Sequence, residues 1–174
     1  MRATAVLVGA AAIVLFGVWG ALLINDWAVA AASGLPLDET VAAMERAGQP
    51  YSAMAGVLFA VFGALLAIAW AYLMRSRHFA LSTWAGLAFW AAIIAFGAPA
   101  YFFASFGNLN SVGDTFFDWN AGAAFALALP LYLVSGAAAV LTLVAFVLAL
   151  LRFSASSRQR PEPGATPATQ QTGQ

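Results

Sequence analysis

The stretch SAMAGVLFAVFGALLAIAWAYLMRSRHFALSTWAGLAFWAAIIAFGAPAYFFAS, residues 52–105, contains two uncharged apolar runs separated by Arg75-Ser76-Arg77-His78. About 20 apolar residues are enough for a helix to cross the hydrocarbon core of a bilayer. Arginine is enriched in the cytoplasmic loops of membrane proteins. The stretch therefore predicts a transmembrane helical hairpin whose turn lies in the cytoplasm.

The whole chain has the composition of an integral membrane protein. Of its 174 residues, 63% are hydrophobic and 8% are charged, whereas a soluble domain has about 25% charged residues. The mean hydropathy is +0.87. We predict an all-α, four-transmembrane-helix bundle over residues 1–151, with spans at about 3–24, 52–74, 81–106 and 127–151. Residues 152–174 lose the apolar periodicity and are predicted to form a disordered tail.

The first apolar run also fits a second interpretation, a cleaved signal peptide. Ala28-Val29-Ala30 resembles a small-residue cleavage site. The apolar core of a signal peptide has about 7–15 residues, and this run is longer, which favours a retained span.

The arginines predict the orientation. Arg2, Arg75, Arg77, Arg152, Arg158 and Arg160 fall on one side of the predicted membrane, and Arg46 alone falls on the other. By the positive-inside rule, both termini are cytoplasmic, and the connectors 25–51 and 107–120 are external. We expect the plasma membrane as the location.

The first external connector has helix start and stop signals between Pro36 and Ala47. Leu37, Val41 and Met44 share one face of this short amphipathic helix. A helix lying on the membrane surface and a helix covering the end of the bundle both fit the pattern.

Small residues form a candidate packing face on the second span. They recur at spacings of three and four, at Ser52, Gly56, Ala60, Gly63 and Ala67. Small residues let helix backbones approach closely in lipid. An Ala-rich composition alone could also produce the pattern. The fourth span has a similar small face that includes Ser135, Thr142 and Ala145.

The third span is rich in aromatic residues and contains Pro99. Proline removes an intrahelical hydrogen bond, which predicts a helix kink there. The kink could shape a cavity or be a tolerated packing feature.

Polar and aromatic residues form a candidate cluster at the outer rim. Its members are Asn25, Asp26, Trp27, Asp114, Asp118, Trp119 and Asn120. Asp114 is a candidate N-cap. We further expect a turn or short helix near Phe116 to Phe125 and an adjustment around Pro130. The side-chain oxygens of these residues could bind a hard cation such as Ca²⁺. Helix capping explains the same residues without a ligand, and we therefore predict no metal site.

The sequence lacks the residues on which several classes of transporter and enzyme depend. The predicted spans contain no Asp, Glu, His, Lys or Arg, although proton pumps and ion-coupled transporters normally need one. The chain has no cysteine, and its single histidine, His78, lies at the cytoplasmic edge. Nucleotide, zinc-protease and EF-hand motifs are absent. We therefore expect no enzyme activity and no cofactor.

Two functional hypotheses remain. The first is an accessory or scaffold subunit that acts by helix association, with the lipid bilayer and either another membrane protein or a second copy as partners. The second is a transporter or channel for an uncharged or apolar solute, using the Pro99 kink and the aromatic residues of the third span. No nucleic acid is expected as a partner.

Overall fold

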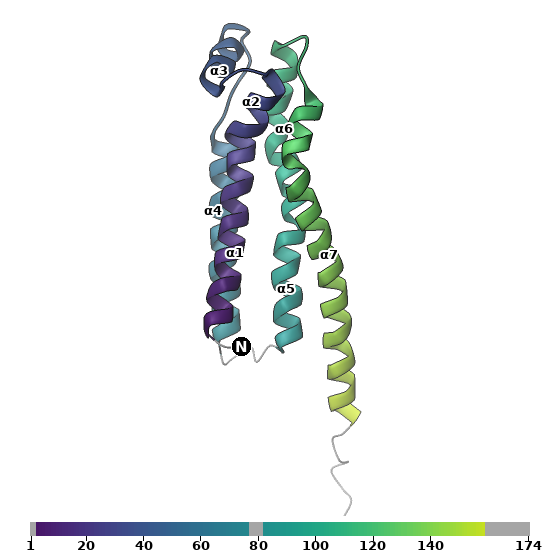
Figure 1. The fold of residues 1–174 in the computed structure, drawn as a ribbon. Coiled ribbons are helices and arrows are strands. Elements are labelled where there is room, and N and C mark those ends of the chain that lie inside the picture. The colour runs from purple at the N-terminus through teal and green to yellow at the C-terminus, as the bar shows by residue number, and fades with distance from the viewer. Residues whose placement is uncertain (1–2, 77–81, 159–174) are drawn as a thin grey trace, which may run out of the picture.

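The computed structural model describes residues 3–76 and 82–158, and in these ranges every regular element is a helix (Figure 1). The elements are α1 (Ala3–Leu22), the π-helix η1 (Leu23–Trp27), α2 (Ala28–Ser33), α3 (Leu37–Arg46), α4 (Met54–Arg75), α5 (Thr83–Ala95), α6 (Gly97–Thr115) and α7 (Ala121–Arg158). Four helical segments are long and apolar enough to cross a membrane, namely Ala3–Ser33, Met54–Arg75, Thr83–Thr115 and Ala121–Ser154. This confirms the predicted all-helical architecture with four apolar helices.

The helices extend further than the predicted spans. The first continues to Ser33, the third continues to Thr115, and the fourth begins at Ala121. Polar residues such as Asn25 and Asn108 do not end these helices, because their side chains find partners within the bundle.

The C-terminal boundary also differs from the prediction. Helix α7 continues to Arg158, although disorder was predicted from Arg152. No proline or glycine interrupts residues 152–158, and Pro161 is the first proline that follows them. Residues 159–174 of the predicted tail lie outside the described residues.

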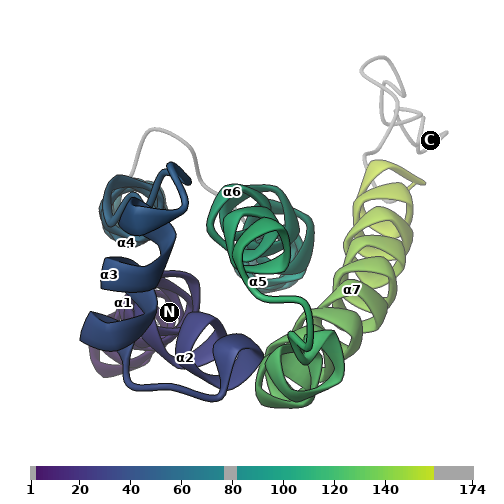
Figure 2. The same ribbon diagram turned by 90° about the horizontal axis from the view of Figure 1, so that it is seen from above.

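The helices pair along their lengths. Helix α1 packs along α4, and α5 packs along α7, while α6 continues the column of α5 toward the end where α3 lies (Figures 1 and 2). At the end where α3 lies, here called the α3 end, α2 reaches across to α7. The opposite end, near Trp84, is here called the Trp84 end.

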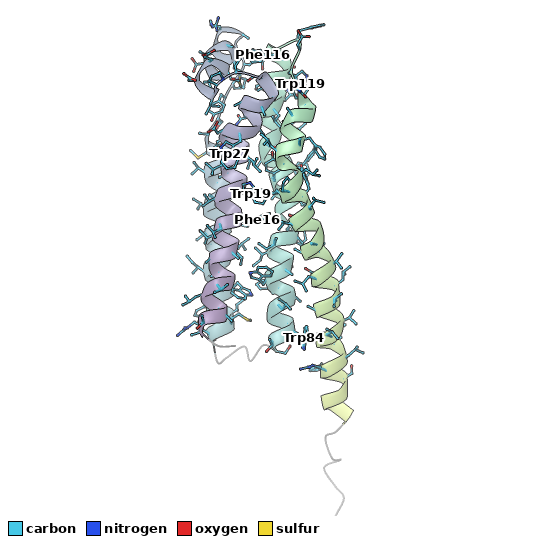
Figure 3. The ribbon with its side chains drawn as sticks, in the orientation of Figure 1. Phe16, Trp19, Trp27, Trp84, Phe116 and Trp119 are labelled. Carbon is cyan, nitrogen blue, oxygen red and sulfur yellow. The ribbon has the colours of Figure 1, made fainter. Side chains whose placement is uncertain are left out.

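Aromatic residues lie near both ends of the molecule. Figure 3 shows Trp27, Phe116 and Trp119 toward the α3 end and Trp84 at the opposite end. The Arg152 guanidinium carbon lies 5.6 Å from the centroid of the Trp84 ring. Tryptophan and tyrosine are enriched at the two interfaces of membrane proteins, so this distribution agrees with a spanning orientation.

The third helical segment breaks at Phe96, between α5 and α6. Pro99 lies in the first turn of α6 and cannot donate to the carbonyl of Ala95. The ring of Phe16 packs closely against Gly97, where a β-carbon would collide with it. Proline and a close ring contact therefore coincide at this break. In contrast, α7 continues through Pro130 without interruption.

Helix α3 covers the end of the bundle. Its Met44 side chain is fully buried in a cluster with Ala28, Val29 and Val112, and Leu37 packs against the same cluster. Its acidic residues Asp38 and Glu39 are exposed. The apolar face of α3 is thus occupied by the protein, which favours the covering helix over the membrane-surface helix.

Candidate functional site

The π-helix η1 creates an unusual polar junction near the α3 end. In η1 the Ala28 amide donates to the carbonyl of Leu23, so the carbonyl of Ile24 loses its ordinary α-helical donor. The Nδ2 atom of Asn108 replaces that donor at 3.2 Å. The same side-chain amide donates to the Ser52 carbonyl at 3.0 Å and accepts from the Ser52 amide at 3.0 Å. One asparagine therefore joins η1, α6 and the segment that leads into α4.

Asn25 caps the start of α4 from a distance in sequence. Its Nδ2 donates to the Ala53 carbonyl at 2.9 Å, and its Oδ1 accepts from the Gly56 amide at 3.2 Å. The Tyr51 hydroxyl donates to the Asn25 carbonyl at 2.6 Å. Burial raises the pKa of the Tyr51 hydroxyl above its usual value, and the Asp26 carboxylate raises it further. These contacts give Asn25 a structural role.

The remaining rim residues have separate partners. Asp114 lies in the last turn of α6 and accepts from Asn110 Nδ2 at 3.2 Å, so its predicted role as N-cap is wrong. Asn120 is the cap instead, because its Oδ1 accepts from the Ala123 amide at 2.9 Å. Asp26 is half-buried, whereas Trp27, Asp118 and Trp119 are exposed. Among the described residues, no three His, Asp or Glu side chains are placed to hold a metal ion.

The predicted small-residue face of α4 is directed mainly toward α1. Gly56 and Ala67 are buried, Ala60 and Gly63 are half-buried, and Ser52 is exposed. A β-carbon at Gly17 of α1 would lie 3.6 Å from Gly63 Cα and 3.6 Å from the Ala60 carbonyl oxygen. The close approach of these backbones requires small residues.

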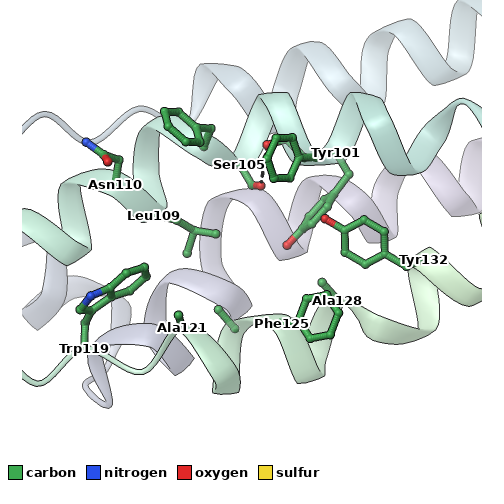
Figure 4. Close-up of a pocket in the computed structure, with 12 residues that line it drawn as sticks. Tyr101, Ser105, Leu109, Asn110, Trp119, Ala121, Phe125, Ala128 and Tyr132 are labelled. Atoms are coloured by element: carbon green, nitrogen blue, oxygen red, sulfur yellow. Dashed lines mark hydrogen bonds between the residues drawn. The ribbon is translucent and has the colours of Figure 1, made fainter.

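A cavity of about 240 Å³ lies between α6 and α7, toward the α3 end (Figure 4). Its lining begins two residues after Pro99. Twelve residues line it, and none of them is charged: Tyr101, Phe102, Ser105, Phe106, Leu109, Asn110, Trp119, Ala121, Ala124, Phe125, Ala128 and Tyr132. This cavity, here called the aromatic pocket, is the strongest candidate for a binding site.

The aromatic pocket has a buried floor and partly exposed walls. Tyr101 is only 2% exposed and Ser105 only 4%, and together they form part of the floor. Phe102, Phe106 and Phe125 line the pocket but are each at least half exposed on the surface of the molecule. The pocket thus lies on the side of the bundle, between the interior and the surface.

In comparisons with known proteins, no family model, no curated protein and no solved structure matches the chain.

The rings of the pocket are arranged around the Tyr132 side chain. The Tyr101 and Tyr132 ring centroids are 5.8 Å apart with their planes at 84°, an edge-to-face contact. The Phe125 and Tyr132 centroids are 5.7 Å apart, with only 30° between the planes. The second pair forms one extended aromatic surface along α7. A flat molecule could lie against it.

Hydroxyl groups provide polarity at the pocket floor. Ser105 Oγ donates to the Phe102 carbonyl at 3.2 Å, and the Tyr101 hydroxyl lies beside Ser105. Figure 4 shows the Tyr101 and Tyr132 hydroxyls directed into the pocket. The pocket can therefore accept an apolar body and a polar, uncharged group together.

A second cavity, of about 500 Å³, is a wide apolar groove toward the Trp84 end. It is lined by Thr4, Ala5, Val8, Gly9, Trp70, Leu87 and Trp90. Both indole nitrogens already have partners, because Trp70 Nε1 donates to the Gly86 carbonyl at 3.0 Å and Trp90 Nε1 donates to the Gly9 carbonyl at 2.9 Å. The two indole nitrogens therefore have no free proton to offer a ligand in this groove.

The sequence indicated the aromatic character of the third span, but it did not indicate that residues of α6 and α7 together line a pocket. Tyr132 belongs to α7, and its approach to Tyr101 depends on how α6 and α7 pack. Asn108 was missed because it was assigned to a connector. The neighbouring residues Gly107, Asn110 and Ser111 gave the segment the polar character of a connector, and no local signal distinguished Asn108 from them.

Proposed function

We propose that this protein binds an uncharged amphipathic molecule from the surrounding membrane in the aromatic pocket. The observation that carries the proposal is a buried floor of hydroxyl groups beneath aromatic walls, with no charged side chain in the lining. Ligand sites commonly combine an apolar lining with a few placed polar groups. This is the binding step that the uncharged-solute hypothesis requires.

The position of the pocket supports entry from the side. Phe102, Phe106 and Phe125 reach the surface of helices that are apolar enough to span a membrane. A molecule dissolved in lipid would meet these rings first and then reach Tyr101 and Ser105. A charged molecule would lose its hydration there without gaining a partner of opposite charge, which is costly.

We also propose a plasma-membrane location with both termini in the cytoplasm. Arg152 contacts Trp84, and Arg75 ends α4 at that same end of the molecule, whereas Arg46 ends α3 at the other end. This distribution supports a cytoplasmic Trp84 end by the positive-inside rule. The aromatic pocket would then open in the outer half of the membrane.

An accessory or scaffold role is a second candidate. The small residues that suggested it are used within the chain, since Gly63 packs on Gly17 and Ser135 Oγ donates to the Ile94 carbonyl at 2.9 Å. The groove beside Trp70 and Trp90 is the observation that still favours this role, because a partner helix could fill it. Crosslinking in native membranes followed by mass spectrometry would identify such a partner.

The binding proposal can be tested with the full chain in lipid nanodiscs. Two uncharged probes, 2-acetylnaphthalene and 2-ethylnaphthalene, would be titrated by equilibrium dialysis, with empty nanodiscs as the reference. Ala121→Phe adds bulk to an exposed pocket-lining position, and Ala126→Phe adds the same bulk to an exposed position of α7 outside the lining.

We expect saturable binding of at least one probe, weakened about tenfold or more by Ala121→Phe and unchanged by Ala126→Phe. Binding that does not exceed the empty nanodiscs, or that responds equally to both substitutions, would overturn the proposal.

A further inference from the structure

We infer that the aromatic pocket selects a flat aromatic or quinoid molecule whose carbonyl oxygen accepts a hydrogen bond from Tyr132, with Tyr101 beside it. The inference rests on the proposed function, because it names the class of molecule that the pocket would bind. It follows from the donors, the ring geometry and the charge of the lining.

The hydroxyl groups of the pocket differ in whether their protons already have an acceptor. Ser105 Oγ donates its proton to the Phe102 carbonyl, and the Tyr101 hydroxyl lies beside Ser105. Within the described part of the chain, the Tyr132 hydroxyl has no hydrogen-bond partner. A ligand that brings a carbonyl oxygen supplies the missing acceptor.

The rings favour a flat ligand. Phe125 and Tyr132 form one wall, with 30° between their planes. Phe102 and Phe106 contribute rings from α6, with centroids 6.4 Å apart and 48° between the planes. Flat aromatic bodies gain offset-stacked and edge-to-face contacts with such walls. The volume of about 240 Å³ lies just below the usual range of about 300–1,000 Å³ for ligand pockets. It therefore suits a body of one or two fused rings.

The lining favours a neutral ligand over a lipophilic cation. Aromatic faces do attract cations, so a quaternary ammonium is the competing occupant. However, no carboxylate lines the pocket, and Asp114 is exposed and already accepts from Asn110. A desolvated cation would lack a counter-charge in the pocket.

The experiment compares three probes of similar shape in nanodiscs. 2-Acetylnaphthalene carries the carbonyl acceptor, 2-ethylnaphthalene replaces it with a methylene group, and (2-naphthylmethyl)trimethylammonium carries a cation. Each dissociation constant is corrected for partitioning into empty nanodiscs. Tyr132→Phe and Tyr101→Phe remove one hydroxyl each and keep the ring, and Tyr72→Phe is the matched control on the exposed surface of α4.

We expect the ketone to bind about threefold to tenfold more tightly than the hydrocarbon, the range that one net hydrogen bond provides. Tyr132→Phe should remove most of this preference and leave hydrocarbon binding unchanged, Tyr101→Phe should reduce it, and Tyr72→Phe should leave it intact. The thermal unfolding temperature verifies that each variant is folded.

The outcomes separate this inference from the proposed function. Equal binding of ketone and hydrocarbon, both weakened by Ala121→Phe, would overturn the acceptor class while retaining the pocket as a binding site. Tighter binding of the cation would overturn the choice of a neutral ligand. Absence of saturable binding by every probe would overturn both.

Discussion

The side-chain amide of Asn108 on α6 donates to the main-chain carbonyl of Ile24 in η1 at 3.2 Å, across 84 residues of sequence. The π-helical turn displaces the ordinary donor of this carbonyl, and Asn108 replaces it. The irregularity of the first helix is thus compensated by a tertiary hydrogen bond. The same side-chain amide also makes two hydrogen bonds with the main chain of Ser52. Burial of polar groups is tolerated where each one finds a partner.

Asn108→Leu should destabilise the protein strongly. The substitution keeps a similar size but removes three hydrogen bonds and leaves the buried Ile24 carbonyl without a donor. We expect a loss of about 2–4 kcal/mol in the free energy of unfolding. Asn110→Leu, which removes one exposed bond to Asp114, is the control and should cost less than about 0.5 kcal/mol. Equal unfolding temperatures of the two variants in detergent would contradict the role of Asn108.

Gly56→Ala should destabilise the start of α4. A β-carbon there would lie 2.5 Å from the Asn25 amide, which is fixed by its bonds to Ala53 and Gly56. Moving Asn25 would break this cap, at an expected cost of about 1–3 kcal/mol. Gly107→Ala is the matched control, because nothing lies within 4 Å of its β-carbon position. Alanine is the better helix former, so Gly107→Ala should be neutral or stabilising. A stabilising Gly56→Ala would refute this account.

The long apolar runs of the sequence predicted the helical architecture, because every helix that spans a bilayer needs about 20 apolar residues and must satisfy its backbone hydrogen bonds internally. It could not predict where the helices end. Asn25 and Asn108 resemble boundary residues when they are considered singly, and only their tertiary partners show why the helices continue through them. The extension of α7 past Arg152 has a local reason, the absence of a helix-breaking residue before Pro161.

The candidate site was predictable only in part. The aromatic residues after Pro99 were visible in the sequence as a possible cavity wall. The opposite wall comes from Phe125 and Tyr132, which the sequence placed around the start of another span without indicating their contact with α6. The register of α6 against α7 depends on the packing of whole helices, and no local pattern specifies it.

Stability should decrease at alkaline pH partly because of Tyr51. Burial, and secondarily Asp26, raise the pKa of this hydroxyl in the folded state above its usual value of 10.0. The unfolded state therefore loses its proton first, and stability declines as the pH rises above about 10 until the folded-state pKa is passed. Below that window the contribution of Tyr51 is constant.

Tyr51→Phe provides the comparison for this pH dependence. The variant loses the hydrogen bond to the Asn25 carbonyl, so at neutral pH it should be less stable by about 0.5–1.5 kcal/mol. Its unfolding temperature should then fall less steeply than that of the wild type between pH 10 and 11.5. Parallel curves for the two proteins would show that Tyr51 does not titrate as expected.

Single-cysteine labelling should place α3 outside the cell and the turn after α4 inside it. The chain contains no cysteine, so the unmodified protein provides the background, and Glu45→Cys and Ser76→Cys each add one thiol. Glu45 is exposed on α3, and Ser76 follows Arg75 at the other end of α4. Because six of the seven arginines were assigned to the Ser76 side, the positive-inside rule predicts that an impermeant maleimide labels Glu45→Cys on intact cells. Ser76→Cys should react only after the cells are permeabilised. Labelling of Ser76→Cys on intact cells, with Glu45→Cys protected, would invert the topology and place the aromatic pocket in the inner half of the membrane.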